Sequence, residues 1–241
     1  MTGDSDMWEC RKFARSLCEK ESRLEILINN AGVAFTPRRI TGDSLEMVTQ
    51  VNHLSSFLLT NLLVDLLSAA GDSRVVMVSS LAHGWVKQAL NYEDITWETS
   101  SYSMKEVYGQ SKLANILFAK EFGRRHQEAG IRTYSVHPGA VLTELGRDIK
   151  EKLPVWLVPV TDYLSSLFLM SPRGGAQTIL YCAVEPALSG QTGLYYADCS
   201  VRTPSQTAQS SQEAQKLWKF SSDIVGDMTP LGIKTLGEKE K

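Results

Sequence analysis

Cysteine is scarce in this chain, and neither sign of charge dominates. The four cysteines, Cys10, Cys18, Cys182 and Cys199, show neither the CxxC spacing of a zinc site nor the density of a disulfide scaffold. We therefore expect a reducing compartment and no metal site. The 25 basic and 27 acidic residues give a formal charge of -2 and form no basic stripe, which argues against nucleic acid as a partner.

Long uninterrupted apolar segments are absent as well. The first residues, MTGDSDMWECRKF, contain no apolar core of a signal peptide. Pro154, Pro159 and Asp162 interrupt the most apolar stretch, residues 153–170, which is barely long enough to cross a bilayer. We expect no transmembrane span there, and favour an apolar lid at a pocket or a segment that dips into a membrane surface.

Short apolar runs alternate with helical patterns over the whole chain. The runs LEILIN (24–29) and RVVMVS (74–79) are continuous, which is typical of strands buried on both faces of a parallel sheet. Further strands are expected at 131–139 and 193–197, and helices at 44–70, 108–129, 173–184 and 211–226. This alternation predicts an α/β fold with a doubly wound, Rossmann-like parallel sheet, in a single domain over 1–241 with a frayed tail at 230–241.

Polar residues and glycines follow three of these strands, where ligands of parallel sheets bind. They are the segments NNAG (29–32), Ser79-Ser80 and His137-Pro138-Gly139. Asn30 and Gly32 tolerate a tight turn, and Gly32 would equally permit the close approach of a cofactor. Both interpretations stay open from the residues alone.

Tyr108 and Lys112 lie four residues apart in an expected helix, so their side chains share one face. An ammonium group stabilises phenolate, and we therefore expect Lys112 to lower the pKa of Tyr108. The tyrosine could then act as a general acid and base at neutral pH. The spacing alone is also compatible with two polar residues on a helix surface.

Ser80 and Asn52 each have a structural and a functional interpretation. Ser80 is a candidate hydrogen-bond donor to a substrate oxygen or, alternatively, a turn or helix cap. No GxSxG elbow surrounds it, which argues against a nucleophilic serine. Asn52 lies within an apolar helical pattern, where a buried amide must find partners either in the core or in a site.

Taken together, these residues resemble the short-chain dehydrogenase/reductase family in their order and spacing. The motifs are NNAG, Asn52, Ser79-Ser80, the Tyr108/Lys112 pair, and Pro138-Gly139 with Thr143. The segments RLEILINNAGV, YGQSKLANILFAKE and SVHPGAVLTEL resemble the retinol dehydrogenase-type branch.

The resemblance implies a role for each of these residues. It implies that Tyr108 is the general acid/base, and that Lys112 is the cation that lowers the pKa of Tyr108 and binds the nicotinamide ribose. It implies that Ser80 polarises the substrate carbonyl and that Asn52 anchors a water molecule of a proton relay. It further implies that Asn30, Ala31 and Gly32 line the adenosine side of the cofactor, and that Pro138, Gly139 and Thr143 line the nicotinamide side.

The implied activity is hydride transfer between NADP(H), or alternatively NAD(H), and a lipophilic alcohol or aldehyde such as a retinoid. Steroid and lipid-aldehyde substrates stay open as alternatives, because they need the same kind of pocket. The resemblance also implies an intracellular location, in the cytoplasm or peripheral at an endoplasmic reticulum or mitochondrial membrane, and a possible homo-oligomer.

One departure from the family is large, because the chain contains no TGxxxGxG phosphate-binding loop. We therefore expect an N-terminally truncated fold in which LEILIN exposes unpaired backbone groups and an apolar face. Dinucleotide binding is expected to be weak, and this form inactive. The alternative function is a non-catalytic interaction protein that pairs with full-length relatives through the helices at 44–70 and 108–129.

Overall fold

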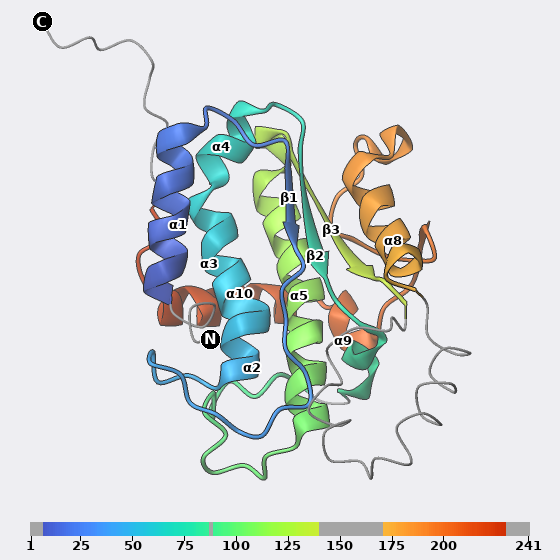
Figure 1. Ribbon diagram of the computed structural model, residues 1–241. Coiled ribbons are helices and arrows are strands. Elements are labelled where there is room, and N and C mark those ends of the chain that lie inside the picture. Colours follow the sequence, from blue (N-terminus) through green and yellow to red (C-terminus); the bar gives the residue numbers. More distant parts are fainter. Residues whose placement is uncertain (1–6, 87–88, 140–170, 230–241) are drawn as a thin grey trace, which may run out of the picture.

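The computed structural model describes residues 7–86, 89–139 and 171–229 (Figure 1). The expectations for Thr143, for the apolar stretch 153–170 and for the tail 230–241 lie outside these residues. Among the residues that are described, no helix combines the length and the apolar character that crossing a membrane requires.

A five-stranded sheet runs through the described part of the chain in the order β1-β2-β3-β4-β5. Its strands are β1 (Ile26–Asn29), β2 (Ser73–Val78), β3 (Ile131–His137), β4 (Leu194–Ala197) and β5 (Ser200–Val201). The first four are parallel, and β5 pairs antiparallel with β4. The register places Leu27 opposite Val75 and aligns the carboxyl ends of β1, β2 and β3 along one edge.

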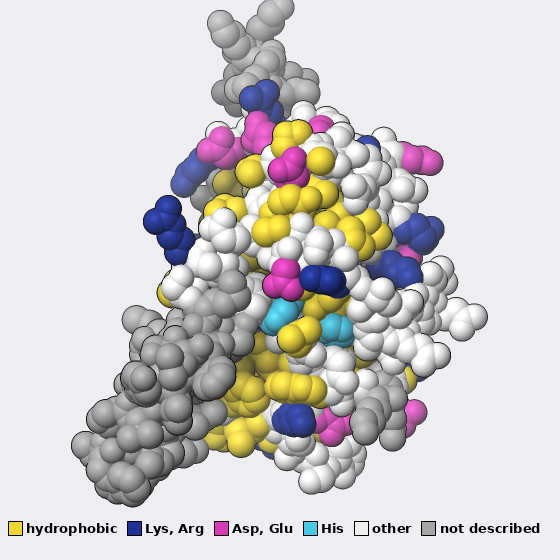
Figure 2. All heavy atoms as spheres, turned by 90° about the vertical axis from the view of Figure 1, so that its right-hand side faces the viewer, with side chains coloured by type: hydrophobic (Ala, Val, Ile, Leu, Met, Phe, Trp, Pro, Cys, Tyr) yellow, Lys and Arg dark blue, Asp and Glu magenta, His cyan; other side chains and the backbone are white. Residues whose placement is uncertain are grey.

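Helices cover both faces of this sheet, which confirms the predicted α/β architecture. One face carries α1 (Met7–Lys20), α3 (Ser55–Leu62), α4 (Val64–Ala69), α5 (Met104–His126) and α10 (Ser211–Val225). The opposite face carries α8 (Pro172–Val184), which stands apart from the others in Figure 1. Figure 2 looks onto the α8 side, where hydrophobic side chains reach the surface; Leu180 and Val184 of α8 are exposed.

The helices begin where short polar side chains cap their first turn. Ser103 accepts a hydrogen bond from the backbone N–H of Glu106 at the start of α5, and Ser210 accepts one from Glu213 at the start of α10. Ser171 caps α8 in the same way, with Pro172 at the first helical position. These caps explain why the expected helix starts agree with the structure to within a few residues.

The helix expected over residues 44–70 is wrong as a single element. It consists of α2 (Met47–Thr49), a π-helical turn at Gln50–Leu54, α3 and α4. A π turn holds one more residue per hydrogen-bonded ring than an α turn, and such turns concentrate at functional sites. This one contains Asn52 and His53, both buried.

Burial of the first two strands differs from the expectation drawn from their apolar runs. All six residues of β2 are buried, as predicted. In β1, Ile26 and Ile28 are 38% and 39% exposed, because β1 is the edge of the described sheet and α8 covers this face of it only in part. Within the described part of the chain β1 is thus an edge strand, and the expected burial of LEILIN on both faces is wrong.

Candidate active site

The residues singled out in the sequence converge at the carboxyl ends of β1 and β2, against the first half of α5. Ser80 follows β2, Tyr108 and Lys112 lie on α5, and Asn52 comes from the π turn. All three of the helical side chains are at most 8% exposed. The site is therefore assembled from segments that are remote in sequence and rigid in the fold.

Tyr108 lies across from Ser80 and is enclosed by aromatic rings. Its side chain lies beside that of Ser80, and its ring centroid lies 5.4 Å from that of Phe35 and 6.5 Å from that of Trp85. Burial raises the pKa of the phenol, and the Ser80 hydroxyl opposes that rise. The net shift of the Tyr108 pKa is therefore upward, contrary to the expected lowering, and the phenol is neutral at pH 7.

The Lys112 ammonium group is not among the causes of this pKa shift. Nζ donates a hydrogen bond to the carbonyl oxygen of Val78, at 3.1 Å, and lies 5.6 Å from the centroid of the Tyr108 ring. It thus approaches the ring of Tyr108 but is held by the end of β2. Burial also lowers the pKa of Lys112 to about 8, which leaves the amine mostly charged at neutral pH.

Asn52 connects the loop after β1 to α5. Its Oδ1 accepts from the backbone N–H of Val33 at 2.7 Å, and its Nδ2 donates to the Val33 carbonyl at 2.9 Å and to Ser111 Oγ at 3.0 Å. Ser111 in turn donates to the carbonyl of Tyr108 at 2.8 Å. These hydrogen bonds support the structural interpretation of Asn52, and its functional role stays a prediction.

Ser80 is held by its own loop rather than by α5 alone. Its Oγ accepts from the backbone N–H of Ala82 at 3.2 Å and caps the short helix η3 (Leu81–Trp85). The neighbouring Ser79 has a structural task, since its Oγ donates to the Lys112 carbonyl at 2.7 Å. Of the two serines, only Ser80 presents its hydroxyl to Tyr108.

Two glycines permit the close approach on which this arrangement depends. A Cβ on Gly109 would lie 2.9 Å from the carbonyl oxygen of Ala82, so a larger residue would push η3 and Ser80 away from α5. A Cβ on Gly32 would lie 3.1 Å from Asn52 Oδ1 and 3.4 Å from Lys112 Nζ. The loop after β1 can therefore rest against the lysine only because residue 32 has no side chain.

The residues expected to bind a cofactor border this group on two sides. Asn30 and Ala31 are exposed directly after β1, and Gly32 faces Lys112. Pro138 and Gly139 are half-buried after β3, where Gly139 has a positive φ of 91°. The exposed strand end at Asn30 and Ala31, close to a buried ammonium, fits a polar, anionic or hydroxylated group lying along the strand ends.

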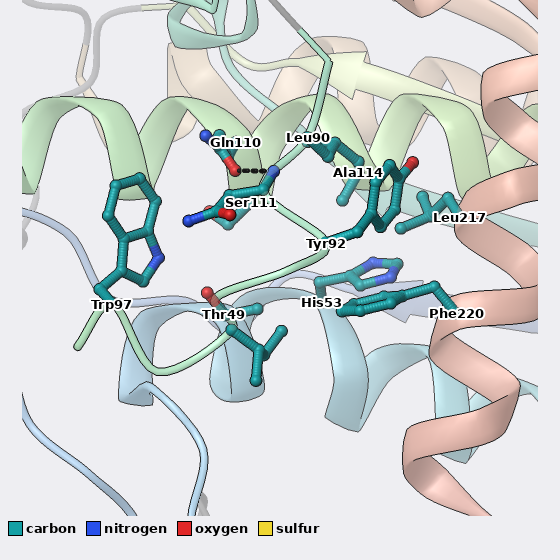
Figure 3. Close-up of a pocket in the computed structure, with 12 residues that line it drawn as sticks. Thr49, His53, Leu90, Tyr92, Trp97, Gln110, Ser111, Ala114, Leu217 and Phe220 are labelled. Carbon is teal, nitrogen blue, oxygen red and sulfur yellow. Dashed lines mark hydrogen bonds between the residues drawn. The ribbon is translucent and has the colours of Figure 1, made fainter. Parts of the chain in front are cut away.

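The long segment between Ser80 and Tyr108 is tied together by one carboxylate. Asp94 accepts hydrogen bonds from the backbone N–H groups of Glu98, Thr99 and Ser100, each at 2.8 to 2.9 Å. Burial acts to raise the pKa of Asp94, but these bonds outweigh it and hold the pKa below its usual range. A small cavity of about 30 Å³ lies between this segment, the π turn and α10, lined by polar groups of Thr49, Gln110 and Ser111 (Figure 3). It has room for about one water molecule and is not a substrate pocket.

Sequence reasoning missed several supporting residues. They are Phe35, His83, Gly109, Ser111 and Asn115. Asn115 Nδ2 donates to the same Val78 carbonyl that Lys112 binds, at 3.2 Å, and its Oδ1 contacts His53 Nδ1 at 3.4 Å. The available signal was the polar residues on the otherwise apolar, buried run of α5, since buried polar side chains need partners.

A family model described as Enoyl-(Acyl carrier protein) reductase matches residues 5–157. The chain is 40% identical to Retinol dehydrogenase 13 of Homo sapiens over 220 residues and 41% identical to Retinol dehydrogenase 14 of Mus musculus over 216. These matches cover 91% and 90% of this chain but 66% and 63% of the relatives. The chain thus spans about two thirds of the length of the curated relatives it matches.

Two solved structures share the architecture. A crystal structure of an uncharacterized protein from Mycobacterium Paratuberculosis has a TM-score of 0.70 at 30% identity, with 92% of this chain and 73% of that chain covered. An NADPH-bound carbonyl reductase from chicken fatty liver has a TM-score of 0.53 at 21% identity, with 80% and 71% covered. The second match is a likeness of fold only.

Proposed function

Because this chain belongs to the short-chain dehydrogenase/reductase family, and within it resembles the retinol dehydrogenases, we propose that it is an oxidoreductase that interconverts a carbonyl and an alcohol with a nicotinamide cofactor. The observation that carries the proposal is that the Ser80 hydroxyl, the buried Tyr108 phenol, Lys112 and Asn52 lie side by side at the strand ends. No nucleophile-and-base pair for acyl transfer accompanies Ser80 among the described residues.

The protonation states support a chemical direction. Burial keeps the Tyr108 phenol neutral, so it can donate a proton to a carbonyl oxygen as that oxygen gains charge. Ser80 can hold the same oxygen, because its hydroxyl already lies at the phenol. Loss of the proton leaves a phenolate beside the charged Lys112, which stabilises it. We therefore propose carbonyl reduction as the favoured direction.

The cofactor we propose is NADP(H), with NAD(H) as the alternative. When bound, it supplies or accepts the hydride. The residues suited to hold it are Lys112, whose ammonium can donate to a ribose hydroxyl, the open strand end at Asn30, Ala31 and Gly32, and the loop at Pro138 and Gly139. Thr143, which the family resemblance adds, stays a prediction.

The substrate we propose is a lipophilic aldehyde or ketone, such as a retinoid. Aromatic rings of Phe35 and Trp85 stand against Tyr108, and Leu81 and Trp85 are 61% and 43% exposed next to Ser80. Apolar groups at the rim of a site suit a greasy carbonyl compound. The similarity to retinol dehydrogenases supports the same class.

The test is titration of the purified chain with NADPH and NADH, followed by cofactor fluorescence and by thermal shift, and then an assay of retinal reduction. Ligand binding to the folded state must raise the apparent stability. Tyr108→Phe should retain cofactor binding and lower kcat by at least about 1000-fold, since it removes the proton donor and little else. Cooperative unfolding with no binding of either cofactor would refute the proposal.

A second function, association with another polypeptide, is favoured by the open edge of β1. Helices α3 and α5, which were expected to carry such a contact, are unsuitable, because α1 packs on α3 and α10 packs on α5. The exposed surface is instead formed by Ile26 and Ile28. If a cellular effect survives Tyr108→Phe but is lost in Ile26→Lys/Ile28→Lys, association is the function.

A further inference from the structure

His83 lies one turn beyond Ser80 and contacts two backbone groups that are far apart in sequence. Its Nδ1 lies 2.6 Å from the carbonyl oxygen of Ser80, and its Nε2 lies 3.1 Å from the backbone nitrogen of Ser205. The imidazole is 5% exposed and its ring packs edge-on against Tyr195, with centroids 5.1 Å apart. Nothing in the proton transfer from Tyr108 requires this residue.

These two contacts determine the tautomer of His83. A backbone N–H can only donate, so Nε2 must accept from Ser205 and carry no proton. A carbonyl oxygen can only accept, so Nδ1 must carry the proton and donate it to Ser80. Only the neutral Nδ1–H form satisfies both contacts, and burial, which lowers the pKa of His83, favours that neutral form.

The far end of the contact is itself anchored. Ser205 precedes α9 (Gln206–Gln209), and its carbonyl accepts from the backbone N–H of Gln209 at 3.2 Å. Ala208 of α9 packs in the same buried cluster as Leu113 of α5 and Tyr195 of β4. The imidazole therefore connects the Ser80 loop to a segment whose position is set by the core.

We propose that His83 is a positioning residue that fixes Ser80 in the orientation in which it faces Tyr108, by bridging the Ser80 carbonyl to the Ser205 amide. Two atoms of Ser80 are then held: its carbonyl oxygen accepts from the Nδ1–H and the backbone N–H of His83, and its Oγ accepts from the backbone N–H of Ala82. The hydrogen bonds of His83 to Ser80 and Ser205 do not depend on any enzymatic activity. Their effect on catalysis rests on the proposed oxidoreductase function.

The first measurement determines the tautomer of His83 and does not require enzymatic activity. Long-range proton–nitrogen NMR of the histidine-labelled full chain distinguishes the two neutral tautomers and the charged ring, and the His83→Asn spectrum assigns the resonance. We expect a proton on Nδ1 and none on Nε2 of His83. A proton on Nε2, or a charged ring at pH 7, overturns the proposal whether or not the chain is an enzyme.

The second measurement compares three replacements in the retinal reduction assay. His83→Leu removes both contacts and should lower kcat about 10- to 100-fold with KM and cofactor affinity changed by less than about threefold, because a misoriented group costs transition-state stabilisation. His83→Asn keeps a donor near the Nδ1 position and should recover most of the loss. His126→Leu, which removes a half-buried histidine at the far end of α5, should leave kcat unchanged.

The third measurement tests whether His83 acts through Ser80. If it does, Ser80→Ala should lower kcat much less in the His83→Leu background than in the wild-type chain. Additive losses would overturn the positioning role. Should His83→Leu fail to unfold cooperatively, the same cycle is run with His83→Gln, whose Oε1 can still accept from Ser205. A wild-type chain without turnover refutes the proposed function, and the tautomer measurement then decides the bridge by itself.

Discussion

The neighbouring strands β1 and β2 have almost the same kind of sequence and very different surroundings. Every residue of β2 is buried, between α5 on one face and α8 on the other, whereas Ile26 and Ile28 of β1 are more than a third exposed. Ser80 follows the packed strand, and the expected cofactor residues Asn30 to Gly32 follow the open one. We call the region after β2, which is proposed to transfer the proton, the packed half of the site, because helices support it on both faces. We call the region after β1, which is proposed to bind the cofactor, the open half, because it is the more exposed.

The largest expected effect comes from placing the same charged group in each of the two strands and comparing the loss of stability. Val76→Asp places a carboxylate in the buried centre of β2 and should abolish cooperative folding, a loss of more than about 4 kcal/mol. Ile28→Asp places the same group on the exposed side of β1 and should cost less than about 1 kcal/mol. Urea unfolding followed by circular dichroism measures both. Similar losses in the two variants would mean that β1 is covered in solution.

Acidification should lower the free energy of unfolding, because His53 is buried in its neutral form. This side chain is buried between Asn115 and Ser221, and burial lowers its pKa from 6.5 to about 4. Its contribution is fully present above pH 6.5 and is lost as the pH falls toward 4, because the unfolded chain binds the proton first. The shift corresponds to about 3 kcal/mol.

Urea midpoints at pH 7.5, 6 and 5 measure this loss, and a His53→Gln chain should show a flatter profile. Asp94 and Glu121 have lowered pKa values and lose their contributions only at lower pH, below the usual carboxyl range. An unchanged slope in His53→Gln would assign the acid sensitivity to another histidine.

Asn52 is the residue that couples the open half to the packed half. Asn52→Leu leaves the backbone N–H and carbonyl of Val33 without their side-chain partner, and should cost about 2 kcal/mol. It should also weaken NADPH binding, because the loop that carries Gly32 is no longer held against α5. Asn61→Leu removes an amide that bonds only within its own helix, and serves as the control with a smaller effect.

Gly32→Ala should have the smallest effect on folding and a specific effect on binding. The added Cβ meets Asn52 and the flexible end of Lys112, so stability should fall by less than about 1 kcal/mol. Cofactor affinity should fall several-fold, measured by NADPH fluorescence. Gly42→Ala, where a Cβ meets nothing within 4 Å, is the matched control. Equal affinities in the two variants would place the cofactor elsewhere.

The order of elements was predictable because its signals are local. Apolar runs predicted β2 and β3, and the expected helix starts at 173 and 211 agree with those of α8 and α10 to within one residue. The exposure of Ile28 was not readable from its run, since LEILIN and RVVMVS differ in their neighbours rather than in their pattern. It followed only from the family resemblance and the missing phosphate-binding loop.

The four residues at the centre of the site were likewise predictable as a set, but their electrostatics were not. Burial of the phenol decides the direction of the Tyr108 pKa shift, and Lys112 Nζ is held by the Val78 carbonyl, 34 residues away in sequence. The role of His83 depends on Ser205, at a separation of 122 residues. No local pattern reports such contacts, because they exist only after the sheet has formed.

That last separation has a consequence for synthesis. At about 5 to 20 residues per second, a ribosome needs roughly ten seconds to extend the chain from His83 to Ser205. During this time Ser80, Tyr108 and Lys112 have all been made, yet the backbone amide that completes the bridge does not exist. A nascent chain halted before Ser205 would contain the family's signature residues, but Ser80 would not be held in place. The catalytic arrangement proposed here can therefore form only late in translation.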